Sequence, residues 1–199
     1  MNLVPLIQMK QRKIYLEEGK NPIDYKEFLK KFEEERKIYI LDWDGIEKDK
    51  PNLCTFQRLS PLYELWVDFG PRDLGDVVDA FLAGATEITL RTHLCPQLAI
   101  SDIKKLSENK VYANIDFENM NLKNIDDLFF YESDGLVNFN SKAKIDQDIR
   151  YSDFLNNLRM KNKLYSYDSN PENRSYWKQF GAEGLLVDIN KFEEFKNDF

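Results

Sequence analysis

The chain has 199 residues, and its 28 basic and 35 acidic residues give a net charge of −7. Its length suits one domain (residues 1–199), and 42% hydrophobic residues are enough for a sizeable core. The basic residues are spread among acidic ones, which argues against a nucleic-acid partner. No apolar run reaches the ~20 residues that cross a bilayer, and the N-terminal residues lack the order of a secretory signal. We therefore expect a cytoplasmic protein with no membrane partner.

Short apolar runs rich in Val, Ile, Leu and Tyr recur along the chain and are too short for helices. They predict strands at Leu3–Gln8, Ile38–Asp42, Glu64–Asp68, Glu87–Arg91, Val111–Asp116, Leu136–Asn140, Lys163–Tyr167 and Leu185–Asp188. Helical patterns lie between them at Ile23–Arg36, Asp73–Ala83, Ile100–Leu106, Leu122–Phe130, Tyr151–Met160 and Pro171–Phe180. This alternation predicts parallel strands with helical crossovers.

Eight such units close naturally into a barrel, whereas an open doubly wound sheet lacks support because no GxGxxG turn follows the first strand. We predict an α/β fold, a minimal single-domain (β/α)8 TIM barrel. The length is short for that fold, so the crossovers 49–61 and 141–149 are expected to be short or irregular. FLAGATEITL (81–90) and QFGAEGLLVD (179–188) echo each other, which places Gly84 and Gly181 before the fourth and eighth strands.

Five short motifs carry a resemblance: VPLIQMKQRKIYL (4–16), LDWDGI (41–46), VDFGPRD (67–73), GATEITLRT (84–92) and GAEGLLVDIN (181–190). They resemble motifs of the histidine-biosynthesis barrels, in particular the ribotide isomerase (HisA) and its archaeal HisA-related relatives. The resemblance implies a TIM barrel that acts on a small polar or phosphorylated metabolite. It also implies an isomerase- or lyase-like role in a biosynthetic cofactor pathway of archaeal type. NIDF (114–117) places Asp116 at the family's acid/base position.

The departures from the family pattern are informative. In the isomerase, Asp residues at the ends of the first and fifth strands act as acid and base, and the first position here is Gln8. A carboxamide cannot shuttle a proton near neutral pH, so we do not expect the isomerase activity. Asp68, Phe69 and Arg91 occupy glycine positions of the family's phosphate sites. The anion site that the resemblance leaves consists of Gly70, Arg72, Arg91 and Thr92.

Active sites of TIM barrels lie at the C-terminal strand ends, which form the mouth of the barrel. Besides the anion site, we expect Gln8, Lys10, Asp42, Asp68, His93 and Asp116 there, with Asp116 and Asp42 as catalytic candidates. The three carboxylates would hold Mg²⁺ or a basic substrate in one interpretation. In the favoured interpretation they form an ion-pair network with Arg72 and Arg91. We expect no metal and no cofactor.

Other candidates have two interpretations each. His93 is the single histidine, and it fits a structural loop residue better than a general base paired with Cys95. Aromatic residues at Trp43, Trp66, Phe69 and Trp177 either stack on a ligand or pack between strands and helices.

Two functions therefore remain open. One is an enzyme that acts on a small, polar or phosphorylated metabolite at the mouth. The other is a catalytically silent barrel that binds a metabolite or a partner protein, which a mouth plugged by side chains such as Phe69 would favour. A homo-oligomer is compatible with either.

Overall fold

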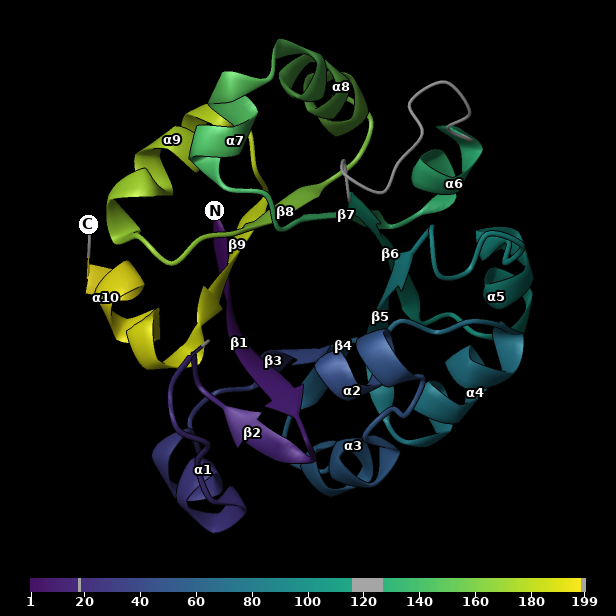
Figure 1. The fold of residues 1–199 in the computed structure, drawn as a ribbon, viewed down its shortest axis with the longest axis vertical. Coiled ribbons are helices and arrows are strands. Elements are labelled where there is room, and N and C mark those ends of the chain that lie inside the picture. The colour runs from purple at the N-terminus through teal and green to yellow at the C-terminus, as the bar shows by residue number, and fades with distance from the viewer. Residues whose placement is uncertain (18, 116–126, 198–199) are drawn as a thin grey trace.

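The structure is a computed structural model that describes residues 1–17, 19–115 and 127–197. Its strands are β1 (Asn2–Lys10), β2 (Lys13–Tyr15), β3 (Lys37–Asp42), β4 (Glu64–Asp68), β5 (Ala85–Arg91), β6 (Lys110–Ile115), β7 (Gly135–Asn138), β8 (Leu164–Tyr167) and β9 (Gly184–Asp188). All but β2 run parallel in chain order, and β9 pairs with β1 to close the sheet (Figure 1). The predicted (β/α)8 TIM barrel is confirmed, and each of the eight predicted strands has its counterpart.

Helices surround the barrel (Figure 1). They are α1 (Tyr25–Lys31), α2 (Trp43–Lys48), α3 (Leu53–Leu59), α4 (Leu74–Leu82), α5 (Ile100–Leu106), α6 (Asp127–Glu132), α7 (Lys142–Gln147), α8 (Ile149–Arg159), α9 (Arg174–Phe180) and α10 (Phe192–Asn197). Short 3-10 turns precede α9 and α10, namely η1 (Pro171–Asn173) and η2 (Ile189–Lys191). Because no helix in these described ranges is both long and apolar, none of them could cross a membrane.

Two crossovers are more regular than the sequence suggested. The segment 49–61 contains α3, whose Phe56 and Leu59 are fully buried one turn apart. The segment 141–149 contains α7, and the side chain of Ser141 accepts a hydrogen bond from the backbone N–H of Lys144 at its start. Both helices have only six or seven residues, so each offers a single turn of apolar spacing. That is too little for a periodic signal.

The hairpin of β1 and β2 was missed. Its two-residue turn places both Gln11 and Arg12 in the left-handed region, with φ of 53° and 61°. Such a turn normally contains Asn-Gly, and the sequence therefore carried no turn signal. By contrast, Gly84 and Gly181 lie just before the fourth and eighth barrel strands, as the internal echo predicted, and both have left-handed φ values.

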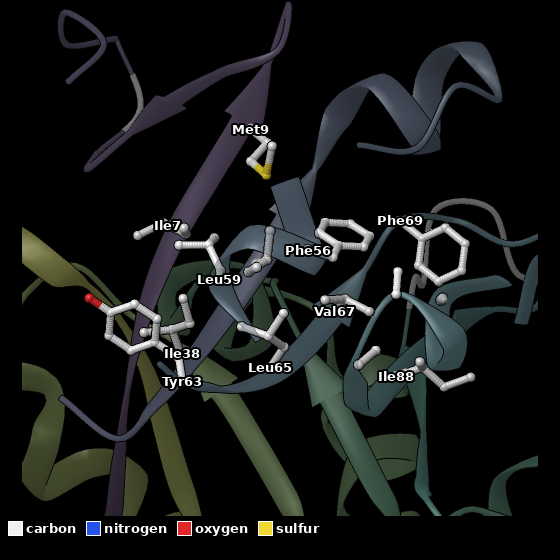
Figure 2. Packing of buried hydrophobic residues seen from close by; sticks show 14 of the residues in the cluster. Ile7, Met9, Ile38, Phe56, Leu59, Tyr63, Leu65, Val67, Phe69 and Ile88 are labelled. Atoms are coloured by element: carbon white, nitrogen blue, oxygen red, sulfur yellow. The ribbon is translucent and has the colours of Figure 1, made fainter. Parts of the chain in front are cut away.

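Apolar side chains fill both faces of the sheet, as expected for parallel strands covered by helices. The outer core lies between the strands and the helices. Figure 2 shows Phe56 and Leu59 of α3 beside Leu65 and Val67 of β4 in this layer. Phe69 belongs to the same layer, with its ring centre 6.3 Å from that of Phe56.

The inner core fills the barrel itself with Val4, Leu6, Tyr39, Leu41, Trp66, Tyr112, Val137, Tyr165 and Leu186. The ring of Trp66 lies 4.0 Å from that of Tyr112 and 5.0 Å from that of Tyr165, between centres. A Cβ at Gly184 would lie 2.8 Å from the Tyr165 ring, so a residue without a side chain is needed there. The barrel is thus solid below its mouth, and any ligand site must lie above these rings.

Candidate functional site

The alternation of side chains along each strand divides the polar residues at the mouth into two sets, one that faces the barrel interior and one that faces the helices. Side chains two residues apart on a strand point to the same face. Because Leu6, Trp66 and Leu186 belong to the inner core, the residues two positions later face into the mouth. These residues are Gln8, Asp68 and Asp188. The odd-numbered Leu41 and Val137 also belong to the inner core, so the next residues, Asp42 and Asn138, face outward to the helices.

Asp42 acts as the cap of α2. Its Oδ1 accepts hydrogen bonds from the backbone N–H groups of Asp44 and Gly45, at 3.2 and 3.4 Å. The side-chain and backbone N–H groups of Asn52 donate to its two oxygens, each at 2.7 Å. Burial raises the pKa of Asp42 to about 6, although the hydrogen bonds from Asn52 and Gly45 oppose that shift. The carboxylate is fully buried and faces away from the mouth, so the structure places this catalytic candidate in a helix cap.

Asn138 and Asp168 also face outward, and each accepts a hydrogen bond from a helix of the crossover that follows its strand. The hydroxyl of Tyr151, on α8, donates to Oδ1 of Asn138 at 2.5 Å. The indole N–H of Trp177, on α9, donates to Asp168 at 2.6 Å. Polar residues at outward strand ends therefore attach helices to the barrel.

Asp68 and Arg91 form a bidentate ion pair inside the mouth. Nε of Arg91 lies 3.0 Å from Oδ1 of Asp68, and its Nη2 lies 2.7 Å from Oδ2. The hydroxyl of Tyr39 also donates to this carboxylate at 3.1 Å. Burial, and after it the charge of Asp68, hold the pKa of Tyr39 well above its ordinary value. The predicted pairing of Asp68 with an arginine is thus present in the structure, with Arg91 as the partner.

A cavity of about 210 Å³ opens above the inner core. Its walls combine apolar, aromatic and polar side chains from five strands or their ends, namely Leu6, Gln8, Leu41, Trp43, Arg91, Phe139 and Tyr167. We call it the mouth cavity. Trp43 donates its indole N–H to Oε1 of Gln8 at 2.9 Å, which fixes both side chains. The guanidinium of Arg91 lies 5.8 Å from the centre of the Phe139 ring.

Tyr167 completes the wall of the mouth cavity. Its hydroxyl donates to Oδ2 of Asp188 at 2.8 Å, and its ring centre lies 5.7 Å from that of Phe139. Asp188 is 1% exposed. A phenol held by a buried carboxylate is an arrangement that can give or take a proton.

Two larger hollows share walls with the mouth cavity. One, of about 420 Å³, is lined by Gln8, Lys10, Tyr15, Gly19, Lys20, Trp43 and Glu47. The other, of about 430 Å³, is lined by Phe139, Ser141, Lys142, Ala143, Asp146, Tyr167, Asp168, Ser169 and Asn173. Gln8 and Trp43 separate the first from the mouth cavity, and Phe139 and Tyr167 separate the second. The three hollows together are large enough for a metabolite.

The predicted anion site is spread over two places. Arg72 donates to the backbone carbonyls of Gly70 and Ile46, the latter at 2.7 Å, and does not line the mouth cavity. Thr92 is half-buried and His93 is exposed, and neither lines the mouth cavity. Of the four predicted anion-site residues, Arg91 alone lines this cavity. Gly70 has a φ of 64° and closely approaches Leu94, so its position also serves local packing.

Three other predictions concern acid, metal and thiol chemistry. Asp116 lies outside the described residues. In the described part of the chain, no group of three or more His, Cys, Asp and Glu side chains is placed to hold a metal ion. Cys95 is buried, burial raises the pKa of its thiol to about 11, and its Sγ contacts the carbonyl of Arg91 at 3.2 Å.

The aromatic candidates lie in different layers. Trp43 lines the mouth cavity, Trp66 belongs to the inner core, and Phe69 and Trp177 are buried between barrel and helices. Phe69 therefore does not plug the mouth. Sequence reasoning missed Phe139 and Tyr167 as mouth residues. The signal that could have found Tyr167 is its spacing of two from the inner-core residue Tyr165.

Comparisons with known proteins do not assign the chain to a family. No protein-family model matches the chain, and no curated protein matches its sequence. The resemblance to histidine-biosynthesis barrels therefore depends on the short motifs and on the shared barrel architecture alone.

Proposed function

We propose that the barrel binds and transforms a small polar metabolite that carries an anionic group, in the mouth cavity. The observation that carries this proposal is the cavity itself, with Arg91, Gln8 and Tyr167 among aromatic walls. Barrel enzymes hold their substrates at this end of the strands. A phosphate or carboxylate group of the metabolite would lie against the guanidinium of Arg91.

The residues around the mouth cavity suit such chemistry. The bidentate pair with Asp68 holds the guanidinium of Arg91 in place before a ligand arrives. Tyr167 and Asp188 supply a proton donor and its acceptor beside the same cavity. Rings of Trp43 and Phe139 would exclude water from one side of the ligand. These features support an enzyme of the isomerase or lyase type.

The proposal excludes the isomerase reaction of histidine biosynthesis. Gln8 occupies the position of one of the two carboxylates, and its side-chain oxygen accepts from Trp43. Loss of an acid/base group costs roughly 10²–10⁴-fold in rate. Normal growth of a strain that lacks the isomerase, when complemented with this chain, would contradict this part of the proposal.

The second candidate is a catalytically silent barrel that binds a metabolite or a partner protein. The specific observation in its favour is that Arg72 and Arg91 both donate to groups of the protein itself. An arginine used in this way can be purely structural. Ligand-dependent turnover separates the two candidates, because only the enzyme converts a bound metabolite.

The fluorescence of Trp43 offers a direct test. Trp66 and Trp177 are fully buried, whereas Trp43 is half-buried and lines the mouth cavity. Quenching by acrylamide therefore reports on Trp43, and a bound ligand is expected to reduce it. A panel of small phosphorylated and carboxylated metabolites would be titrated against the full chain and against Trp43→Phe, which keeps an aromatic wall but removes the signal.

Two results decide the test. Saturable protection of the wild-type chain, absent in Trp43→Phe, supports binding in the mouth cavity. If no member of the panel changes the quenching of Trp43 at millimolar concentration, the proposed ligand class is wrong.

A further inference from the structure

A fourth hollow lies beside the β1–β2 hairpin, away from the mouth cavity. Its volume is about 380 Å³, and its lining includes Arg12, Lys13 and Arg58 as cations and Asp24 as the single carboxylate. We call it the basic groove. The side chain of Lys13 lies on the face of the hairpin that carries its partner Lys10. Arg12 and Arg58 against Asp24 therefore leave the groove a charge of about +1, in a chain whose net charge is −7. A local excess of positive charge on an acidic protein attracts anions to that point.

The cations of the basic groove are available to a ligand. The side chains of Arg12, Lys13 and Arg58 are exposed, and within the described ranges no ion pair is formed by any of them. The guanidinium of Arg58 lies over the ring of Tyr25, 3.8 Å from its centre, and the Tyr25 hydroxyl donates to the Arg58 carbonyl at 2.8 Å. Its guanidinium is therefore positioned without being neutralised.

The hairpin turn positions Arg12. Gln11 and Arg12 both adopt left-handed backbone conformations, which are unfavourable for residues with side chains. The backbone N–H of Arg12 donates to Oδ2 of Asp44 at 2.9 Å, and this bond holds the turn in that conformation. The turn thus places the backbone of Arg12 at the edge of the basic groove.

The remaining walls are apolar or weakly polar. Ile14, Pro22 and Ile23 line the groove, and Thr55 adds a hydroxyl on α3, one turn before Arg58. Ile14 is 5% exposed and bridges Ile23, so the walls are anchored to the sheet. This combination fits a ligand with one strongly charged end and an apolar remainder.

We propose that the basic groove is a binding site for a small organic phosphate, whose phosphate group lies between Arg12 and Arg58. Arginines bind phosphate oxygens through paired N–H donors. The site is separate from the mouth cavity and does not depend on the function proposed for it. Gln8 and Lys10 line hollows on the mouth side, whereas Ile14, on the opposite face of the hairpin, lines the basic groove.

Calorimetric titration of the full chain with phenyl phosphate tests the site. We expect saturable binding that depends on Arg12 and Arg58 and whose affinity falls with added salt, because the charges are exposed. Arg12→Met and Arg58→Met should each weaken binding about tenfold, as expected for loss of a charged hydrogen bond. Inorganic phosphate, which lacks the apolar part, should bind more weakly than phenyl phosphate.

The matched control is Lys26→Met with Lys30→Met. Both lysines are exposed near or on α1, neither lines the basic groove, and the pair removes the same charge as the two arginines. This control should bind phenyl phosphate as the wild-type chain does. No saturable binding by the wild-type chain, or equal affinity in the Arg12→Met, Arg58→Met double variant, would overturn the site. Equal affinity for the two phosphates would overturn the role of the apolar walls.

Discussion

Asp42 and Asp68 end neighbouring strands, and both carboxylates are fully buried, yet their surroundings are opposite. Asp42 faces outward and accepts only N–H groups that belong to α2 and to Asn52. Asp68 faces into the barrel and is neutralised by Arg91, which itself lines the mouth cavity. Asp42 thus stabilises the fold, whereas Asp68 holds Arg91 in the candidate site. The same division extends around the barrel, with Asn138 and Asp168 on the outward side.

The largest effect on stability is expected from replacing Arg91, the cation that pairs with Asp68 inside the barrel. Arg91→Met leaves Asp68 buried without its ion pair, and breaking a buried pair in this way costs about 3–5 kcal/mol. Urea unfolding would measure this loss in the free energy of unfolding. The double variant Asp68→Asn, Arg91→Met removes the buried charge and should recover most of the loss. A double variant as unstable as Arg91→Met would show that the pair is not the main contribution of these residues.

Loss of the outward carboxylate should cost less. Asp42→Ala removes the α2 cap and leaves N–H groups of Gly45 and Asn52 without their acceptor, which costs about 2–3 kcal/mol. Thermal and urea unfolding would both detect this change. Asp153→Ala on the exposed surface of α8 is the control and should change stability by less than about 0.5 kcal/mol. Equal stability of the two variants would contradict the capping role.

A matched pair of tyrosines sharpens the comparison without removing charge. Tyr151→Phe deletes the hydroxyl that donates to the outward residue Asn138, and should cost about 1–2 kcal/mol of unfolding free energy. Because Tyr151 lies outside the mouth cavity, acrylamide quenching of Trp43 should not change. Tyr167→Phe alters the wall of the mouth cavity and should change ligand protection of Trp43. Identical quenching behaviour of both variants with ligand would remove Tyr167 from the site.

The barrel was predictable from the sequence, whereas the direction of each strand-end side chain was not. The strands are continuous apolar runs, which reveal position and number. Because both faces of these strands are buried, the alternation that would mark inside and outside is missing. LDWDG (41–45) and VDFGP (67–71) look alike, yet they place Asp42 and Asp68 on opposite faces. Only the pairing of neighbouring strands in the closed barrel determines which side chains face the interior and which face the helices.

The missing information on side-chain direction also explains which residues of the candidate site were predicted and which were not. Arg91 was expected at the mouth because a motif placed it at a strand end, and the structure puts it in the mouth cavity. Arg72 was expected beside it, but its guanidinium donates to the backbone carbonyls of Gly70 and of Ile46 on α2. Phe139 was not considered, because nothing in the predicted strand Leu136–Asn140 shows which of its side chains face into the barrel. Side-chain direction therefore decided the outcome for Asp42 and Phe139, and hydrogen bonding to the backbone decided it for Arg72.

The smallest effect on stability is expected at Lys10, on the rim of the mouth. Lys10 lies 3.8 Å from Glu47, with 49% and 44% of the two side chains exposed, and such pairs contribute about 0–1 kcal/mol. Lys10→Met should therefore leave the urea midpoint almost unchanged. Lys10 still lines the hollow next to the mouth cavity, so a ligand that extends there should bind this variant more weakly, as measured by protection of Trp43. Unchanged affinity would confine the ligand to the mouth cavity, and a large loss of stability would show that the rim is part of the scaffold.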